Sequence, residues 1–343
     1  MRKILAIETS CDETAAAIVQ EDRRILSQAI LSQLQEHAPY GGVVPEIAAR
    51  AHMDHLDRLI KQSLTEADVP LEALDAIAAT AGPGLIGGVI VGVMTAKAIA
   101  AVTRKPFIAV NHLEGHALTV RLTDDVPFPY LLLLMSGGHC QIVLVKGISH
   151  YQRLGSTIDD AVGEAFDKVA KMLGLGYPGG PEVERCAKHG AAHNYPLPEP
   201  LKGKPGCDFS FSGLKTAVKR IVDTLGHPPT EQEKADICAS FQYTVGNILC
   251  DRIKKAIQIF QDHCPEGKHV VVSGGVAANK YLRQQLEQLV SAHSLTFVAP
   301  PIKLCTDNAA MIGWAAMERL KLGLVNDLNF APRARWPLDS LKV

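Results

Sequence analysis

The chain has 343 residues, 47% of them hydrophobic and 21% charged, which suffices for about two domains with aliphatic cores. Lys and Arg (35) balance Asp and Glu (36), which argues against a strongly basic protein that wraps nucleic acid unaided. No run of roughly 18 to 20 uncharged apolar residues is evident, the start lacks a signal-peptide pattern, and the eight cysteines form no Cys-x-x-Cys pair. We expect a cytoplasmic protein without a disulfide framework or a zinc ribbon.

The first predicted elements are a strand, a polar turn and a second strand. Ile4 to Ile7 and Ala15 to Val19 are short apolar runs, separated by the polar residues 8–14. The same pattern recurs in the second half as a strand, a turn and a strand at residues 130–135, 136–139 and 141–145. Thr9 and Ser136 then hold matching positions, 127 residues apart.

A second pair of segments repeats a strand, a glycine turn and a helix. The first copy covers residues 76–101 and the second covers residues 270–290. Thr80 and Ser273 are 193 residues apart, so the second half carries about 66 extra residues, which we place between about 155 and 226. Two matched units in the same order predict a duplicated α/β fold that binds a ligand between its halves.

The remaining predicted elements are mostly helices. Apolar residues at helical spacing predict helices over residues 46–66, 158–173, 234–260 and 307–322, and a strand over 107–110. Tyr177 to Pro181 is a turn, and Leu197 to Phe211 is a loop rich in Pro and Gly.

Glycine turns follow three of the predicted strands, at Ser136–Gly138, Gly82–Gly88 and Ser273–Gly275. Such turns expose successive backbone N–H groups and let a phosphate approach the main chain. Gly also marks ordinary tight turns, but three of them at strand ends favour a nucleotide cleft. The chain has no P-loop motif and no dinucleotide fingerprint after the first strand.

Two histidines, His112 and His116, follow the strand predicted at residues 107–110. A spacing of four on a helix puts both imidazoles on one face, where they can share a metal. Two surface histidines near a helix start are the alternative. Asp307 is a candidate third ligand, although it also suits the N-cap of the last helix. A metallopeptidase would need Glu directly after the first His, and Leu113 holds that place.

Read together, eight ordered segments resemble the bacterial TsaD family of tRNA threonylcarbamoyladenosine transferases, over about residues 3–337. These segments are Ile7–Thr14, His112–His116, Ser136–His139, Gly163–Lys168, Tyr177–Pro181, Asp208–Lys215, Ser273–Asn279 and Cys305–Asn308. Two departures are Cys140, where Thr is usual, and Asn111, where many relatives have a further His.

The resemblance implies a duplicated actin-like fold of the sugar-kinase superfamily with two lobes. The first lobe would cover residues 1–125 and be completed by the C-terminal helix and tail at 308–343. The second would cover residues 126–307, with a helical insertion at about 155–226. The implied reaction transfers threonylcarbamoyl from threonylcarbamoyl-AMP to the exocyclic amine of the adenosine 3′ to the anticodon. It occurs in tRNAs that read codons starting with A and releases AMP.

By position, the resemblance makes His112, His116 and Asp307 the ligands of one divalent metal, Fe²⁺ or alternatively Zn²⁺. The implied nucleotide and substrate contacts are Leu134, Met135, Ser136, Gly137, Gly138, Asp167, Gly180, Glu184 and Asn279, at a site that ATP or ADP could also occupy. Carboxylates beside a glycine turn often accept ribose hydroxyls, although exposed helix acids are commoner. Glu13 is the candidate general base.

The implied partners are tRNA, the degenerate paralogue TsaB as a heterodimer and the ATPase TsaE, with no membrane. Basic residues available for tRNA are scattered, at Lys215, Lys219, Arg220, Arg252, Lys254, Lys255, Arg333 and Arg335, and solvated helix faces are the simpler interpretation. The alternatives are an ATP-dependent kinase or ATPase of the same superfamily, in which Glu8 would serve a metal-bound phosphate, and a scaffold without catalytic activity.

Overall fold

The computed structural model describes residues 1–40 and 42–341. The chain divides into two compact units, each containing a five-stranded sheet. Unit 1 comprises Met1–Asp125, Ile148–His150 and Thr306–Val343, and unit 2 comprises Val126–Gly147 and Tyr151–Cys305.

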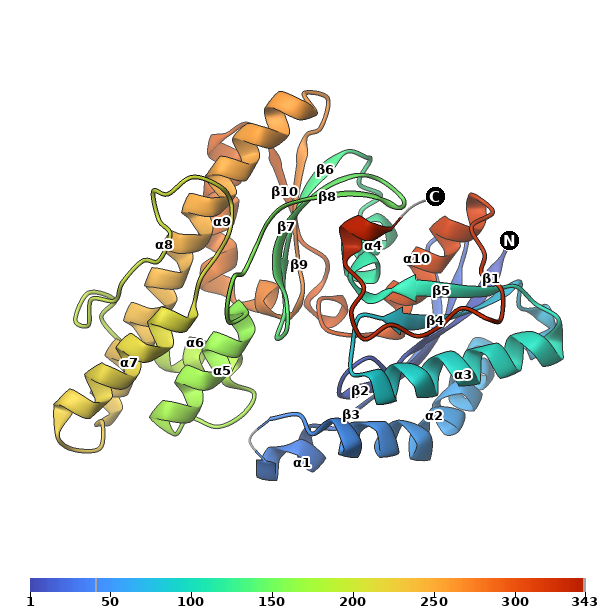
Figure 1. Ribbon diagram of the computed structural model, residues 1–343, viewed down its shortest axis with the longest axis horizontal. Coiled ribbons are helices and arrows are strands. Elements are labelled where there is room, and N and C mark those ends of the chain that lie inside the picture. Colours follow the sequence, from blue (N-terminus) through green and yellow to red (C-terminus); the bar gives the residue numbers. More distant parts are fainter. Residues whose placement is uncertain (41, 342–343) are drawn as a thin grey trace. The chain divides into compact units, whose positions relative to one another are not determined.

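Unit 1 is a three-layer α/β unit (Figure 1). Its strands are β1 (Lys3–Glu8), β2 (Glu13–Gln20), β3 (Ile25–Ser32), β4 (Ala76–Gly82) and β5 (Phe107–Asn111), in the order β3-β2-β1-β4-β5. Helices α2 (Pro45–Ala67) and α3 (Ile86–Thr103) cover one face, and α4 (His112–Thr123) and α10 (Ala309–Lys321) cover the other. The short elements are α1 (Leu34–His37), η1 (Ala38–Tyr40), η2 (Leu71–Ala73) and η5 (Leu338–Ser340). Residues 4–7 of β1 are apolar, and they and the whole of β4 are buried between these layers.

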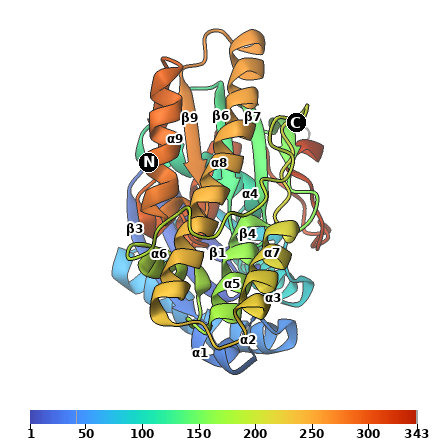
Figure 2. The same cartoon turned by 90° about the vertical axis from the view of Figure 1, so that its left-hand side faces the viewer.

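Unit 2 repeats this sheet with a larger set of helices. Its strands are β6 (Tyr130–Met135), β7 (Cys140–Gly147), β8 (His150–Ser156), β9 (His269–Ser273) and β10 (Thr296–Val298), in the order β10-β9-β6-β7-β8. Its helices are α5 (Val162–Leu173), α6 (Gly179–Ala187), α7 (Ser212–Leu225), α8 (Glu231–His263), α9 (Lys280–Ala292), η3 (Gly275–Ala278) and η4 (Ile302–Leu304). Figure 2 shows α8 and α9 side by side over the sheet of this unit.

The two sheets have the same topology, which confirms the predicted duplication. Strands β6, β7, β8, β9 and β10 correspond in order to β1, β2, β3, β4 and β5. In both sheets the first strand pairs antiparallel with the second and parallel with the fourth. Between β8 and α8 unit 2 carries α5, α6 and α7, whereas the described residues of unit 1 between β3 and α2 form only α1 and η1.

Several elements differ from the sequence-based prediction, among them β10, which was not predicted, and α6, which begins at Gly179 within the predicted turn. The edge strands β3 and β8 were not predicted, because their mixed polar and apolar residues are only partly buried. Helix α5 begins at Val162, not at Ile158. The preceding residues form a loop because the Asp159 carboxylate accepts hydrogen bonds from the backbone N–H groups of Phe211 and Ser212 at the start of α7.

Helix α3 is the one helix among the described residues that is long and apolar enough to cross a membrane by length and composition. Its buried face packs against β4 and α2, through small residues that include Gly88, Gly92 and Ala96. The opposite face exposes Ile86, Ile90 and Met94. The helix is therefore part of the α/β layer of unit 1 and also presents an apolar surface.

Candidate metal centre and nucleotide site

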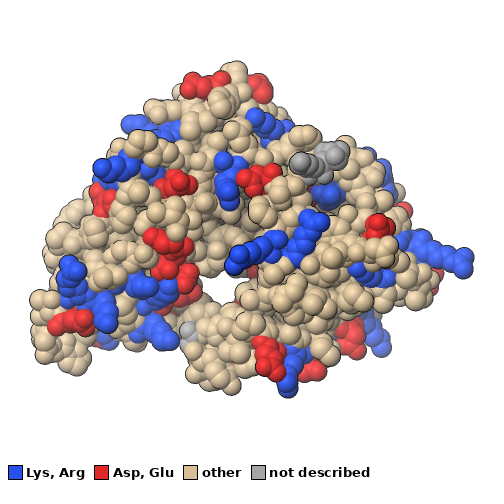
Figure 3. Space-filling model, viewed as in Figure 1, with Lys and Arg blue, Asp and Glu red and all other residues tan. Residues whose placement is uncertain are grey.

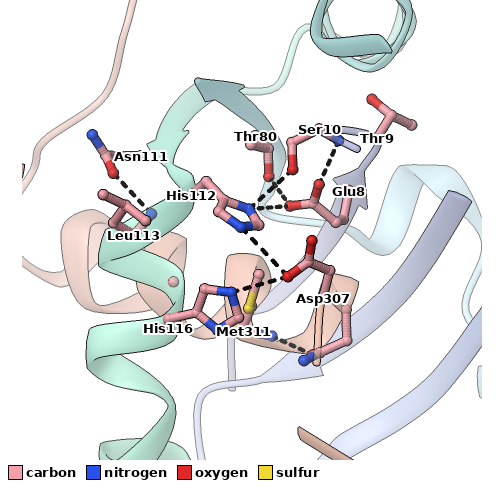
Figure 4. Close-up of polar contacts among 12 residues, drawn as sticks. Glu8, Thr9, Ser10, Thr80, Asn111, His112, Leu113, His116, Asp307 and Met311 are labelled. Carbon is pink, nitrogen blue, oxygen red and sulfur yellow. Dashed lines mark hydrogen bonds and ion pairs between the residues drawn. The ribbon is translucent and has the colours of Figure 1, made fainter. Parts of the chain in front are cut away.

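The three expected metal ligands lie together in unit 1 (Figure 4). His112 and His116 are on the first turns of α4, and Asp307 precedes the first turn of α10. One donor atom from each residue lies within 4.8 Å of the others. Asp307 Oδ1 is 3.0 Å from His116 Nε2 and 3.5 Å from His112 Nε2. Asn308, not Asp307, is the N-cap of α10, which leaves the Asp307 carboxylate pointing at the imidazoles.

The first histidine is held in place by residues at the ends of β1 and β4. His112 Nδ1 lies 3.1 Å from Glu8 Oε2 and 3.1 Å from Ser10 Oγ. The Glu8 carboxylate is fully buried and also accepts hydrogen bonds from the Ser10 N–H and the Thr80 hydroxyl. With Nδ1–H donated to Glu8, the Nε2 lone pair of His112 faces Asp307.

The pKa values of the cluster are set by carboxylates and imidazoles that lie next to each other in a buried site. Burial raises the pKa of Asp307, but the two imidazoles lower it by more, so the pKa of this carboxyl lies well below its usual range. Burial lowers the pKa of His112, but the Asp307 and Glu8 carboxylates raise it by more. The pKa of Glu8 is likewise lowered, because its ion pair with His112 outweighs burial.

This donor set fits a divalent transition metal. Two imidazole nitrogens and one carboxylate oxygen are ligands that zinc and iron(II) both accept. Ligand atoms bound about 2.0–2.2 Å from one metal lie roughly 3–3.5 Å apart, as the two His–Asp distances do. The carboxylate behind His112 is the outer partner that metal-binding histidines usually have.

Glu13, the predicted base, begins β2 on the far side of the turn that follows β1. Burial and the nearby carboxylates of Asp307 and Asp12 raise the pKa of Glu13 to about 9. A carboxyl group with this pKa is protonated at neutral pH, so in this environment it holds a proton and does not accept one.

In unit 2 the Ser136–Gly138 turn lies at the end of β6. Ser136 donates its N–H to the His139 carbonyl and accepts the His139 N–H on its hydroxyl. Gly137 and Gly138 are exposed and have no atom within 4 Å of where a Cβ would lie. Leu134 and Met135 are fully buried in β6, side chain and backbone alike, so in this structure they present no surface to a ligand.

The start of α5 packs against this turn, and the start of α6 packs against α5. A Cβ on Gly163, in the first turn of α5, would lie 2.7 Å from the Ser136 carbonyl oxygen, so only glycine allows this close approach. The Asp167 carboxylate accepts the N–H of Gly179 at the start of α6 at 2.7 Å. Within the described chain no side chain caps α5, so N–H groups in its first turn are available to an anion, whereas the Gly179 N–H at the start of α6 is taken by Asp167.

Of the other predicted contacts in unit 2, Glu184 lines a pocket of about 280 Å³, together with Lys188, Gln242, Lys280 and Tyr281 among others. Glu184 accepts the Lys280 N–H at the start of α9. Asn279 is buried and caps α9 through Leu282 N, while its amide donates to Gln242 Oε1. The Asn279 amide therefore has a structural role. Around Gly180 there is free space, with no atom within 4 Å of where a Cβ would lie.

Several functional features were missed or misassigned from sequence. Ser10 contacts His112, and Thr80 donates a hydrogen bond to Glu8. The one sequence signal for these contacts is position, because Ser10 follows β1 and Thr80 lies in β4. Arg252, grouped above with candidate tRNA contacts, is 1% exposed and donates to the carbonyls of Lys204 and Gly206. Cys140 is buried, and burial raises the pKa of its thiol, so it is not a reactive nucleophile.

The fold and the site define a class: a protein of the actin-like α/β fold with a candidate His–His–Asp metal centre. The structure resembles component A of (R)-2-hydroxyglutaryl-CoA dehydratase from Acidaminococcus fermentans, with a TM-score of 0.54 and 16% identity over 94% of this chain and 100% of that one.

Sequence comparisons identify the family. The sequence profile of TsaD, tRNA N6-adenosine threonylcarbamoyltransferase, matches residues 24–314. A protein of that name from Paramagnetospirillum magneticum is 60% identical over 98% of this chain and 97% of its own length. Another from Rhodospirillum rubrum is 61% identical over 98% of this chain and 95% of its own length. The chain belongs to the TsaD family and is a transferase that modifies tRNA.

Proposed function

We propose that the chain transfers the threonylcarbamoyl group from threonylcarbamoyl-AMP to the exocyclic amine of an adenosine in tRNA, and releases AMP. The acceptor would be the adenosine 3′ to the anticodon in tRNAs that read codons starting with A. The observation that carries the proposal is the convergence of the His112–His116 pair with Asp307, 191 residues further along the sequence, in a chain of this family.

Unit 2 supports binding of the adenylate. We propose that the phosphate lies on the Ser136–Gly138 turn and the uncapped start of α5, where N–H groups and the helix dipole favour an anion. Glu184 would accept ribose hydroxyls, and the pocket of about 280 Å³ beside it suits an adenine ring.

Unit 1 supports the transfer step. A metal held by His112, His116 and Asp307, iron(II) or alternatively zinc, would supply a Lewis acid for substrate oxygens. Glu8 keeps His112 in one tautomer and orientation through the bond to Nδ1. Because a mixed anhydride is already activated, the protein needs only to orient the carbonyl and amine and to stabilise developing charge.

Glu13 is the proposed base, which requires that its carboxyl lose a proton. Its pKa of about 9 reflects burial and the carboxylates of Asp307 and Asp12. A positive charge on the Asp307 side would lower this pKa, because an opposite charge nearby favours the ionised form. Glu13 would then accept the proton that leaves the adenine amine.

We propose that the chain acts in the cytoplasm with the partner proteins TsaB and TsaE. The exposed apolar residues of α3, namely Ile86, Ile90 and Met94, repeat at every fourth position and form one stripe. A contiguous apolar surface of this kind is typical of a protein–protein interface. This stripe supports a protein partner on α3.

The kinase or ATPase alternative is weakened by the surroundings of Glu8. That carboxylate is fully buried and engaged by Ser10, Thr80 and His112. It is therefore not free to hold a metal-bound phosphate.

The test incubates the chain with threonylcarbamoyl-AMP and substrate tRNA, with and without chelator and partner proteins, and then analyses the nucleosides. We expect threonylcarbamoyladenosine with metal and partners, and its loss with chelator. Absence of the modified nucleoside under every condition, with partners present, would overturn the proposal. ATP turnover without tRNA would favour the kinase or ATPase.

A further inference from the structure

We propose that a segment of unit 1, residues 326–336, is a docking surface for the phosphate backbone of RNA, with Arg333 and Arg335 as its contacts. This segment, here called the C-terminal strap, follows α10, runs along β5 and passes the end of β4 (Figure 1). The inference rests on the proposed function in one respect: the RNA is taken to be the tRNA that carries the acceptor adenosine.

The strap is firmly fixed to unit 1 although it contains no long helix or strand. Hydrogen bonds tie it to α3, β4 and β5 along its whole length. They are Asn326 N to Phe107 O (2.9 Å), Ala109 N to Asn326 Oδ1 (2.9 Å), Lys97 Nζ to Phe330 O (2.6 Å), Arg333 N to Ala81 O (2.8 Å), Gly84 N to Ala334 O (3.2 Å) and Asn111 Nδ2 to Trp336 O (2.9 Å). A fixed backbone lowers the entropy lost when its side chains bind a ligand.

The sequence of β4 makes room for the strap. Gly82 has a φ of +133°, and a Cβ at this position would lie 1.9 Å from the Arg333 carbonyl oxygen. Only glycine therefore permits the strap to lie against the end of β4.

The two arginines of the strap are exposed and available to an anion. Among the described residues neither Arg333 nor Arg335 forms an ion pair with a carboxylate. The Arg333 guanidinium lies 5.0 Å from the ring centroids of both Phe330 and Trp336, which holds it in place without neutralising its charge. Figure 3 shows Lys and Arg side chains on the face that the strap crosses in the same view. Guanidinium groups bind phosphate oxygens in pairs of hydrogen bonds.

The strap also offers groups that suit a nucleotide next to a phosphate. Beside Arg333 lies an open hollow of about 410 Å³, which Asn326, Asp327, Asn329 and Phe330 help to line. An amide and a carboxylate can hydrogen-bond ribose hydroxyls and base edges, and an aromatic ring can stack on an unpaired base. This combination favours a single-stranded RNA loop over an isolated phosphate group.

The position of the strap relates it to the metal centre. Asn111 donates to the Trp336 carbonyl and, with its own Oδ1, accepts the N–H groups of Leu113 and Glu114 to cap α4. His112 is the first residue of that helix. RNA that brings an adenosine to the metal centre must carry its flanking phosphates close to the start of α4, and the strap lies there.

The test measures affinity of the full chain, together with its partner proteins, for unmodified substrate tRNA across a range of salt concentrations. Arg335→Ala should weaken tRNA binding about 3- to 10-fold and lower the slope of log K against log salt by about one. Arg335→Lys should restore most of the binding, and the KM for threonylcarbamoyl-AMP should not change. Arg333→Lys should keep the charge but lose the stacked geometry, with a smaller effect than Arg335→Ala.

Lys321→Ala is the matched control. Lys321 is also an exposed base over an aromatic ring, with its Nζ 4.8 Å from the ring centroid of Trp314. It lies in a different place, because its charge helps to lower the pKa of Glu21, which is near the start of β1, whereas Glu8 is at the end of that strand. The Lys321→Ala variant should bind tRNA with the affinity and the salt dependence of the wild type. An equal loss in Lys321→Ala would overturn the proposal, because the effect would then reflect net charge alone.

Three further results would also overturn it. They are unchanged tRNA affinity in Arg335→Ala, a change confined to the KM for threonylcarbamoyl-AMP, and a loss confined to association with an acidic partner protein. Because binding is measured directly, failure of the surface is distinguishable from failure of the proposed function. If only the surface proposal fails, the wild-type chain modifies tRNA and the Arg335→Ala variant binds tRNA normally. If the proposed function fails, no condition yields modified nucleoside.

Discussion

The turn after β1 and the turn after β6 hold the same place in the two duplicated halves, but their surroundings differ. After β1, Thr9 donates its hydroxyl to the Gly88 carbonyl and Ser10 contacts His112, so both side chains are buried in a polar network. After β6, Gly137 and Gly138 are exposed and present their backbone. One topology therefore yields a buried site built from side chains and an open site built from N–H groups.

The difference teaches how a duplicated fold divides two tasks. A metal needs a few ligands held at fixed distances, which buried side chains with outer hydrogen-bond partners provide. A phosphate is larger and must enter and leave, which suits exposed backbone N–H groups at helix starts. We therefore expect mutations in the two regions to separate metal binding from nucleotide binding.

Loss of a metal ligand should have the largest effect. His116→Ala removes one of three donors from the buried cluster, so metal content should fall and transfer should slow by at least about 100-fold. Elemental analysis and nucleoside analysis measure the two effects. His150→Ala removes an exposed histidine from unit 1 and should change neither. Full metal content in His116→Ala would refute the ligand assignment.

A change at Glu8 should have the next largest effect. Glu8→Gln keeps the shape but removes the negative charge beside His112 Nδ1. Metal affinity should drop about 10- to 100-fold, as is usual when the outer partner of a ligand is changed. Metal titration measures this, with ATP-analogue binding as the control that should stay constant. A drop in both would mean that Glu8 supports the fold in general and has no particular role at the metal.

A change at Gly163 should affect the turn after β6 and leave the metal cluster intact. Gly163→Ala places a methyl group 2.7 Å from the Ser136 carbonyl oxygen, so the turn must shift. We expect nucleotide affinity to fall about tenfold, or about 1.4 kcal/mol, with metal content unchanged. Calorimetric titration with an ATP analogue measures it. Gly213→Ala, in the first turn of α7 with its nearest neighbour at 3.7 Å, is the control that should bind normally.

The smallest effect concerns pH and Asp159. Burial raises the pKa of Asp159, but hydrogen bonds from Ser210, Phe211 and Ser212 lower it by more. A lowered folded-state pKa contributes stability above the unfolded pKa of about 4, and this stability is lost as pH falls through the folded value. Asp159→Asn should therefore melt below the wild type at neutral pH, and the difference should vanish in acid. Because Asp159 is exposed, we expect under about 1 kcal/mol. The thermal midpoints of the two proteins are measured from neutral to acidic pH, and a difference that stays constant over these pH values would contradict the account.

The sequence predicted the buried strands, the long helices and the duplication, because each carries a periodic apolar pattern between glycine turns. It indicated His112 and His116 by their spacing of four, but Asp307 lies 191 residues beyond His116, so it was only a candidate ligand until the family resemblance assigned it. The contacts of Ser10 and Thr80 with the cluster depend on strand register, which composition does not reveal. Arg252 seemed basic surface from sequence, although Leu249, Ile253 and Ala256 around it mark a buried helix face.

The most direct test of the account loads metal-free protein with increasing Fe²⁺ or Zn²⁺ and measures threonylcarbamoyladenosine formed in one turnover with partners and tRNA. We predict that the product rises in proportion to bound metal and saturates at one ion per chain, and that His112→Ala gives almost none. The same yield from metal-free protein in the presence of chelator would contradict the account.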